Sequence, residues 1–122
     1  MDPQIELVRA PIAAERLRGL VERWFGDMVK YVVDLERGVI AVGGELHADA
    51  EGVLLDDGSR QADLWGANYY PGRGEDGCIE YTSLINIRPA AGNRSMEIAD
   101  PQVRARLRSR TFELLGRGED LP

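Results

Sequence analysis

The chain has 122 residues, 43% of them hydrophobic, with one cysteine and a formal net charge of −6. This length suits one domain that folds around its own core, and we expect residues 1–122 to form it. The negative charge disfavours general binding to nucleic acids or anionic membranes, which attract Lys and Arg, and a single cysteine excludes an internal disulfide.

The first part of the chain predicts a strand, a helix and a hairpin. Residues 4–9 alternate apolar and polar side chains as a short strand does. Pro11 then suits the first turn of a helix, and Gly26 suits its end. Residues 28–34 and 39–42 are rich in β-branched side chains, and the DLERG turn between them predicts an antiparallel hairpin.

A short helix and a second hairpin are expected next. Asp49 suits the N-cap of the helix, and Gly58 suits its end. Residues 62–71 and 78–89 are strand candidates, and the glycine-rich residues 72–77 predict the loop that joins them.

The last element has the clearest start in the chain, because Asp100 can cap a helix whose first residue is Pro101. Residues 116–122 are expected to fray. The complete order is β-α-β-β-α-β-β-α. It predicts an α+β domain of two layers, with a mostly antiparallel sheet of four or five strands and three helices.

Several classes of protein lack support in the sequence. We expect no signal peptide, because the first residues have neither a basic segment nor an apolar run, and no apolar run in the sequence approaches the roughly 20 residues that span a bilayer. With Cys78 as the one cysteine, these features predict a cytoplasmic protein. Nucleotide-binding glycine motifs and a nucleophile elbow are absent, so no cofactor is expected.

The stretch LINIRPAAGNRS, residues 84–95, begins as an apolar strand and continues into amides and guanidiniums. In strand geometry Asn86 and Arg88 share a face, and Asn68 lies on the same face if the two strands pair. Strand interiors are poor in Asn. Either the amides bind a ligand in a polar pocket, or they tie a loop to the sheet, as buried amides commonly do.

The loop that follows predicts an anion site. Gly92 and Asn93 tolerate left-handed backbone, which can gather N–H groups into an anion-binding nest. Arg88 and Arg94 flank this loop, and a guanidinium suits a carboxylate or a phosphate. The alternative is that each arginine pairs with an Asp or Glu of the same chain.

A second polar cluster is GGELHAD. If the chain stays extended there, Glu45, His47 and Asp49 project to one face, where they suit a divalent cation or acid–base chemistry. His47 is the one histidine and therefore the expected proton carrier near neutral pH. One imidazole with carboxylates is a weak metal set, so no metal site is assigned.

The words FGDMVKYVVDLERGVIAVGGELHAD, LWGANYYP, INIRPAAGNRS and IADPQVR, spread from residue 5 to about residue 115, resemble an uncharacterised prokaryotic family of short proteins. That family is catalogued as a domain of unknown function. The resemblance implies no activity, cofactor or catalytic residue.

These observations predict a small domain that binds an anionic small molecule and that acts as an enzyme if His47 moves a proton. The expected ligand-binding residues are Asn68, Asn86, Arg88, Asn93, Arg94 and Glu45. A non-catalytic homo-oligomeric interaction module is the alternative. A weaker alternative is nucleic-acid binding through the arginines of the last helix, which are Arg104, Arg106, Arg108 and Arg110.

Overall fold

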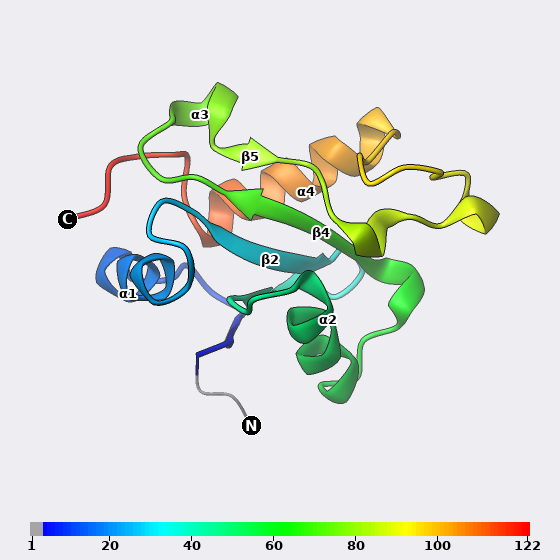
Figure 1. Ribbon diagram of the computed structural model, residues 1–122, viewed down its shortest axis with the longest axis horizontal. Helices are drawn as coiled ribbons and strands as arrows, with labels where there is room; N and C mark the ends of the chain where they lie inside the picture. Colours follow the sequence, from blue (N-terminus) through cyan, green and yellow to red (C-terminus); the bar gives the residue numbers. More distant parts are fainter. Residues whose placement is uncertain (1–3) are drawn as a thin grey trace.

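Five strands form one open antiparallel sheet in the order β1-β3-β2-β4-β5. Figure 1 shows β2 and β4 side by side within this sheet. The structure is a computed structural model and describes residues 4–122. The strands are β1 (Glu6–Val8), β2 (Val29–Asp34), β3 (Val39–Val42), β4 (Leu64–Tyr69) and β5 (Ile79–Glu80).

Three longer helices and one single-turn helix accompany the sheet. They are α1 (Ala14–Trp24), α2 (His47–Asp56), α3 (Gly74–Gly77) and α4 (Pro101–Leu114). Short 3-10 turns lie at Gln61–Asp63, Leu84–Asn86 and Pro89–Ala91. The α+β class, the antiparallel sheet and the order of strands and long helices expected from the sequence are confirmed.

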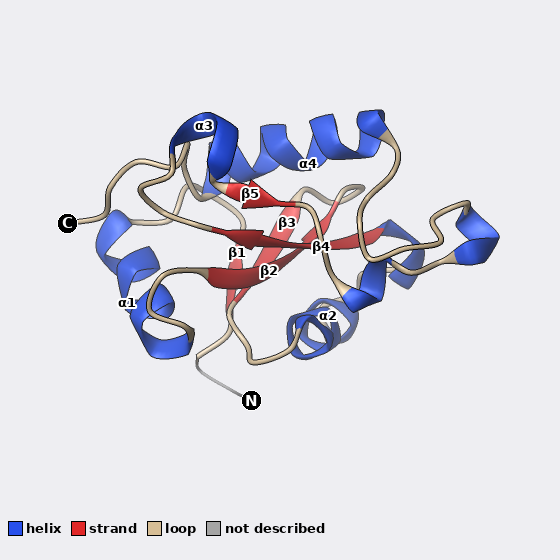
Figure 2. Ribbon diagram, turned by 45° about the horizontal axis from the view of Figure 1, so that its top comes forward, coloured by secondary structure: helices blue, strands red, loops and turns tan. Residues whose placement is uncertain are grey.

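The central strand β2 has buried apolar side chains on both faces, and helices cover both. Tyr31 and Val33 belong to the cluster that contains the apolar residues of α1 and α4. Val32 belongs to the opposite cluster, with Leu54 of α2. In Figure 2 the sheet accordingly lies between α4 and α2. The sequence predicted two layers, one of strands and one of helices. Where α2 covers the second face of the sheet, the fold has three layers.

The elements with strong local signals form as expected. Strands β2 and β3 make the first hairpin, and Gly38 in its turn has a φ of 70°, which favours glycine. Asp100 caps α4 by accepting a hydrogen bond from the N–H of Gln102 at 2.8 Å, and Pro101 is the first helical residue.

Other boundaries differ from the expectation. Helix α2 begins at His47 rather than after Asp49, whose carboxylate instead accepts the N–H of Leu46 from inside the first turn. The second hairpin does pair β4 with β5, but β5 ends at Glu80, and the loop between them contains the single-turn helix α3.

The C-terminal residues pack against the domain instead of fraying. The N–H of Gly118 donates to the Tyr69 hydroxyl at 2.8 Å, and its carbonyl accepts from Gly74 at 3.0 Å. The carbonyl of Glu119 accepts from Gly72 at 3.0 Å. Tertiary hydrogen bonds thus fasten a segment that has little local preference for structure. No helix within residues 4–122 combines the length and apolar character needed to cross a membrane.

Candidate functional site

The side chains of Asn86 and Arg88, rather than another strand, close part of the outer edge of β4. Asn86 Oδ1 accepts the N–H of Gly66 at 2.9 Å, and its Nδ2 donates to the carbonyl of Gly66 at 3.0 Å. Nδ2 also donates to the carbonyl of Met96 at 3.0 Å. The guanidinium of Arg88 donates to the carbonyl of Leu64. One amide side chain therefore replaces a peptide group of a neighbouring strand.

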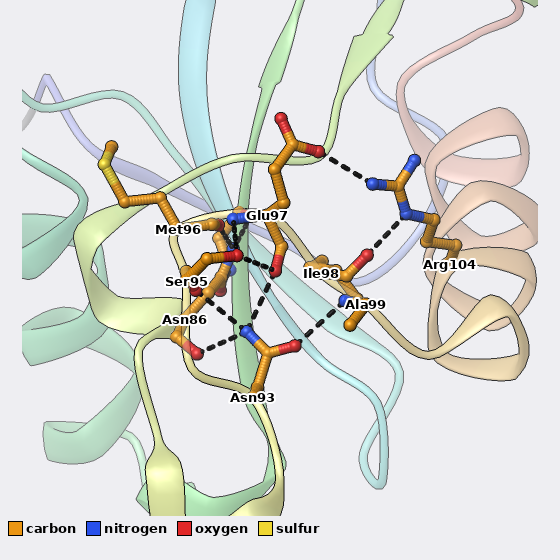
Figure 3. A network of polar contacts seen from close by, with 9 residues as sticks. Asn86, Asn93, Ser95, Met96, Glu97, Ile98, Ala99 and Arg104 are labelled. Atoms are coloured by element: carbon orange, nitrogen blue, oxygen red, sulfur yellow. Dashed lines mark hydrogen bonds and ion pairs between the residues drawn. The ribbon is translucent and has the colours of Figure 1, made fainter.

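Asn93 holds the following loop together (Figure 3). Its Nδ2 lies 2.8 Å from the carbonyl oxygen of Asn86, 2.9 Å from that of Glu97 and 3.0 Å from that of Ser95. Its Oδ1 accepts the N–H of Ala99 at 2.9 Å. Asn86 and Asn93 are both buried and occupied by backbone partners. Asn86 and Asn93 therefore lie as expected for amides that tie a loop to the sheet, and not as expected for amides that line a ligand pocket.

The extended strand expected at residues 84–88 is absent from the structure, where Leu84–Asn86 form a 3-10 turn. Ser83 begins this turn, and its Oγ accepts the N–H of Ile85 at 3.2 Å. Asn86 consequently lies at the edge of the sheet and does not share a face with Asn68. The side-chain amide of Asn86 competes successfully with backbone pairing, as short polar side chains often do.

His47 and Asn68 do meet, in a cavity of about 250 Å³ at the start of α2. We call it the His47 cavity. Its polar lining includes Lys30 and Thr82. Its apolar lining residues are Leu46, Ala48, Leu84, Ile85 and Met96.

A row of polar side chains crosses three strands beside this cavity. Lys30 of β2 pairs in register with Asn68 of β4, and Asn68 pairs with Glu80 of β5. Asn68 Nδ2 donates to the carboxylate of Glu80 at 2.7 Å, which fixes the orientation of the amide, since a carboxylate only accepts. The Tyr70 hydroxyl also donates to Glu80, at 3.3 Å.

Gly66 allows His47 to approach the sheet. A Cβ at this position would lie 2.7 Å from the Ser83 side chain and 3.2 Å from Cδ2 of His47. The imidazole Nε2 lies 2.8 Å from the carbonyl oxygen of Ala67. Because a carbonyl only accepts, Nε2 carries the hydrogen and Nδ1 has the free lone pair.

Burial lowers the pKa of His47, and the positive charge of Lys30 lowers it further. The hydrogen bond to Ala67, a contact with the Asn68 side chain and the charge of Glu80 act in the opposite direction but do not reverse this shift. His47 is therefore neutral at pH 7, with Nδ1 able to accept a hydrogen bond or a proton.

Arg88 lies in a second cavity, of about 510 Å³, which Leu84 and Ile85 also line. We call it the Arg88 cavity. The guanidinium stacks over the ring of Trp65, 4.9 Å from its centroid. Burial lowers the pKa of Arg88, while the nearby carboxylates of Glu51 and Asp63 raise it.

The remaining expected residues stand apart from both cavities. Glu45 and Arg94 are exposed and line neither cavity. Glu45, His47 and Asp49 do not form an extended face, because the last two are in the first turn of α2. Across residues 4–122, no three His, Cys, Asp or Glu side chains gather closely enough to hold a metal ion.

Cys78 lies in the apolar cluster that packs against α1 and α4, and burial raises the pKa of its thiol. His47 lies on the opposite face of the sheet, with α2. The two side chains are therefore not placed for joint nucleophilic chemistry.

Sequence reasoning missed Lys30 and Thr82, which line the His47 cavity, and Glu80, which accepts a hydrogen bond from Asn68. One signal was available, since Lys30 is the single lysine and interrupts a run of β-branched residues. Its relation to Asn68 depends on the register of β2 against β4, which strand periodicity alone does not define.

A family model described as "Protein of unknown function (DUF5674)" matches residues 6–114, which extend from the start of β1 to the end of α4. The expected resemblance is thereby confirmed. No curated protein and no solved structure matches the chain.

Replacing Asn86 with Leu should lower the free energy of unfolding by about 3 kcal/mol or more, because buried backbone groups lose their partners. Arg94→Leu, in the same loop but exposed, should change it by less than about 0.5 kcal/mol. Urea denaturation followed by circular dichroism measures both. Similar small losses in the two variants would contradict the role assigned to the Asn86 amide.

The lowered pKa of His47 predicts that acid destabilises the protein. Below a pH of about 6.5 the unfolded chain binds a proton at His47 before the folded chain does. As the pH falls from the pKa of His47 in the unfolded chain to its lower pKa in the folded chain, the free energy of unfolding should therefore decrease. Below the folded-state pKa, His47 should cause no further decrease. His47→Gln, which retains an N–H donor for Ala67, should lack this decline. Equal pH dependence in both proteins would refute the assignment.

Proposed function

Since the chain belongs to DUF5674, a family of proteins of unknown function, we propose its function from the site itself. The protein binds a small anionic molecule in the His47 cavity. The proposed contacts are Lys30 for the negative charge and Asn68 for a neighbouring hydrogen-bond donor of the ligand.

The unpaired oxygen of Asn68 is the observation that carries this proposal. Asn68 is 6% exposed, and its Oδ1 is buried without a hydrogen-bond partner within residues 4–122. Buried polar atoms are nearly always paired, and leaving one unpaired costs about 1–3 kcal/mol. The residue that carries this atom lines the His47 cavity. A ligand O–H or N–H group there would satisfy it.

The charges around the cavity favour an anion at Lys30. Glu80 is the nearby carboxylate, but it already accepts hydrogen bonds from Asn68 and Tyr70. The ammonium group of Lys30 lies 5.2 Å from the centroid of the Phe25 ring, a contact that leaves its N–H groups able to donate to a carboxylate or phosphate. The ligand class that fits both groups is a small hydroxy or amino acid anion.

His47 adds a chemical option to this binding function. Its neutral imidazole has a free Nδ1, and it is in the same cavity as Lys30 and Asn68. If the bound molecule reacts, His47 is the proton acceptor that the cavity offers. Binding is the function proposed, and catalysis would be an addition to it.

A homo-oligomeric module is the second candidate, because large apolar side chains are exposed at the same cavity. Leu84 is 69% exposed, Leu46 56% and Met96 42%. A stable dimer through this face would bury roughly 1,000 Å² or more in total. Light scattering that shows a monomer at high concentration would contradict this candidate.

Nucleic-acid binding ranks lowest, because the arginines of α4 contact groups of this chain. Arg104 pairs with Glu97, and Arg110 pairs with Glu113. Arg106 donates to the carbonyl of Leu35, and Arg108 lies over the ring of Phe112. We retain a cytoplasmic location as part of the proposal, since buried, unpaired Cys78 suits a reducing compartment.

The proposal predicts that the protein binds lactate more tightly than propionate, because only lactate offers a hydroxyl to Asn68. Lys30→Gln should weaken lactate binding about tenfold, the effect expected for one charged hydrogen bond. Arg94→Gln removes the same charge from an exposed site and should have little effect. Titration of the ¹⁵N-labelled protein by NMR measures these affinities.

Two results would contradict the proposal. One is equal weakening by the Lys30 and Arg94 substitutions, which would indicate a general charge effect. The other is the absence of lactate-induced shifts at amides of Ala48 and Asn68, which lie beside the His47 cavity.

A further inference from the structure

Two residues that line the Arg88 cavity each have a buried polar atom without a hydrogen-bond partner. Nη1 of Arg88 and Oε2 of Glu51 are buried, and neither has a hydrogen-bond partner within residues 4–122. Both residues line this cavity. A buried guanidinium nitrogen and a buried carboxylate oxygen are costly to leave without partners.

The two groups do not satisfy each other, although their charges are opposite. No hydrogen bond or ion pair joins them in the described part of the chain. Other contacts hold Arg88 in place, since its Nη2 donates to the carbonyl of Leu64 and its guanidinium stacks over Trp65. Glu51 is in the middle of α2. Other parts of the fold therefore determine where each group lies.

A neutral amide can provide a hydrogen-bond partner to both atoms at once. Its carbonyl oxygen can accept from Nη1 of Arg88 while its N–H donates to Oε2 of Glu51. A ligand anion would meet the negative charge of Glu51, and a ligand cation would meet the positive charge of Arg88. The opposite charges of Arg88 and Glu51 therefore favour a ligand group that is uncharged and that both donates and accepts hydrogen bonds.

The rest of the cavity is suited to an apolar substituent attached to that amide group. Ile85, Ile87 and Pro89 line it, together with Ala62. We propose that the Arg88 cavity is a binding site for a small neutral carboxamide with an apolar substituent. This site is independent of the proposed function, because neither Lys30 nor Asn68 lines it.

Benzamide is the direct probe, and benzoate and benzylamine are its charged counterparts of similar shape. Benzamide should shift the NMR amide signals of Glu51, Ala62 and Arg88 in the ¹⁵N-labelled protein. It should bind about tenfold more tightly than either counterpart, since each counterpart loses one charged hydrogen bond. Equal affinity for benzoate, or no benzamide shifts at these amides, would overturn the proposal and leave water as the occupant.

Substitutions test the same site from the protein side. Glu51→Met removes the acceptor at similar length and should weaken benzamide binding about tenfold. Glu51→Gln retains an oxygen acceptor without the charge and should weaken it less, while reducing the discrimination against benzoate. Lys30→Gln, in the His47 cavity, should leave benzamide binding unchanged. Unaltered binding in both Glu51 variants would overturn the proposal, and a thermal melt verifies that each variant is folded.

Discussion

The outer edge of β4 needs hydrogen-bond partners, and side chains supply them where β5 has ended. An exposed strand edge is a template for pairing with other chains. Here Asn86 occupies both the N–H and the carbonyl of Gly66, and Arg88 occupies the carbonyl of Leu64. These bonds fix residues 84–91 against the sheet, and Leu84 and Ile85 then form a wall common to both cavities.

The two cavities follow from how α2 covers its face of the sheet. Its apolar residues Ala50 and Leu54 pack over Val32 and its neighbours. The polar row that begins at Lys30 lies outside this cluster, near the start of α2. His47 and Glu51 are one helical turn apart, so they project from the same side of α2 and reach separate cavities. One helix thus contributes an imidazole to one site and a carboxylate to the other.

The sequence predicted those elements well that depend on interactions between residues close together in the chain. The β2–β3 hairpin and the cap at Asp100 depend on neighbouring residues, and both are present. The apolar alternation around Asn86 resembles a strand, but its amide binds Gly66, twenty residues earlier in the chain. Periodicity cannot reveal such a long-range bond.

The candidate site was predicted in part for the same reason. His47 and Asn68, both named from the sequence as polar residues, line the same cavity in the fold. The expected single pocket is instead divided, with Arg88 in the second cavity and Asn93 inside the loop. Lys30 and Glu51 become relevant only through strand register and the path of α2, which require the assembled sheet.

Hydrogen exchange at the amide of Gly66 tests the central claim most directly. If Asn86 Oδ1 holds this N–H as a neighbouring strand would, it should exchange nearly as slowly as the amides inside β2, and Asn86→Leu should abolish that protection. Exchange as fast as that of an exposed loop amide in the unaltered protein would contradict the account, because the edge of β4 would then be open.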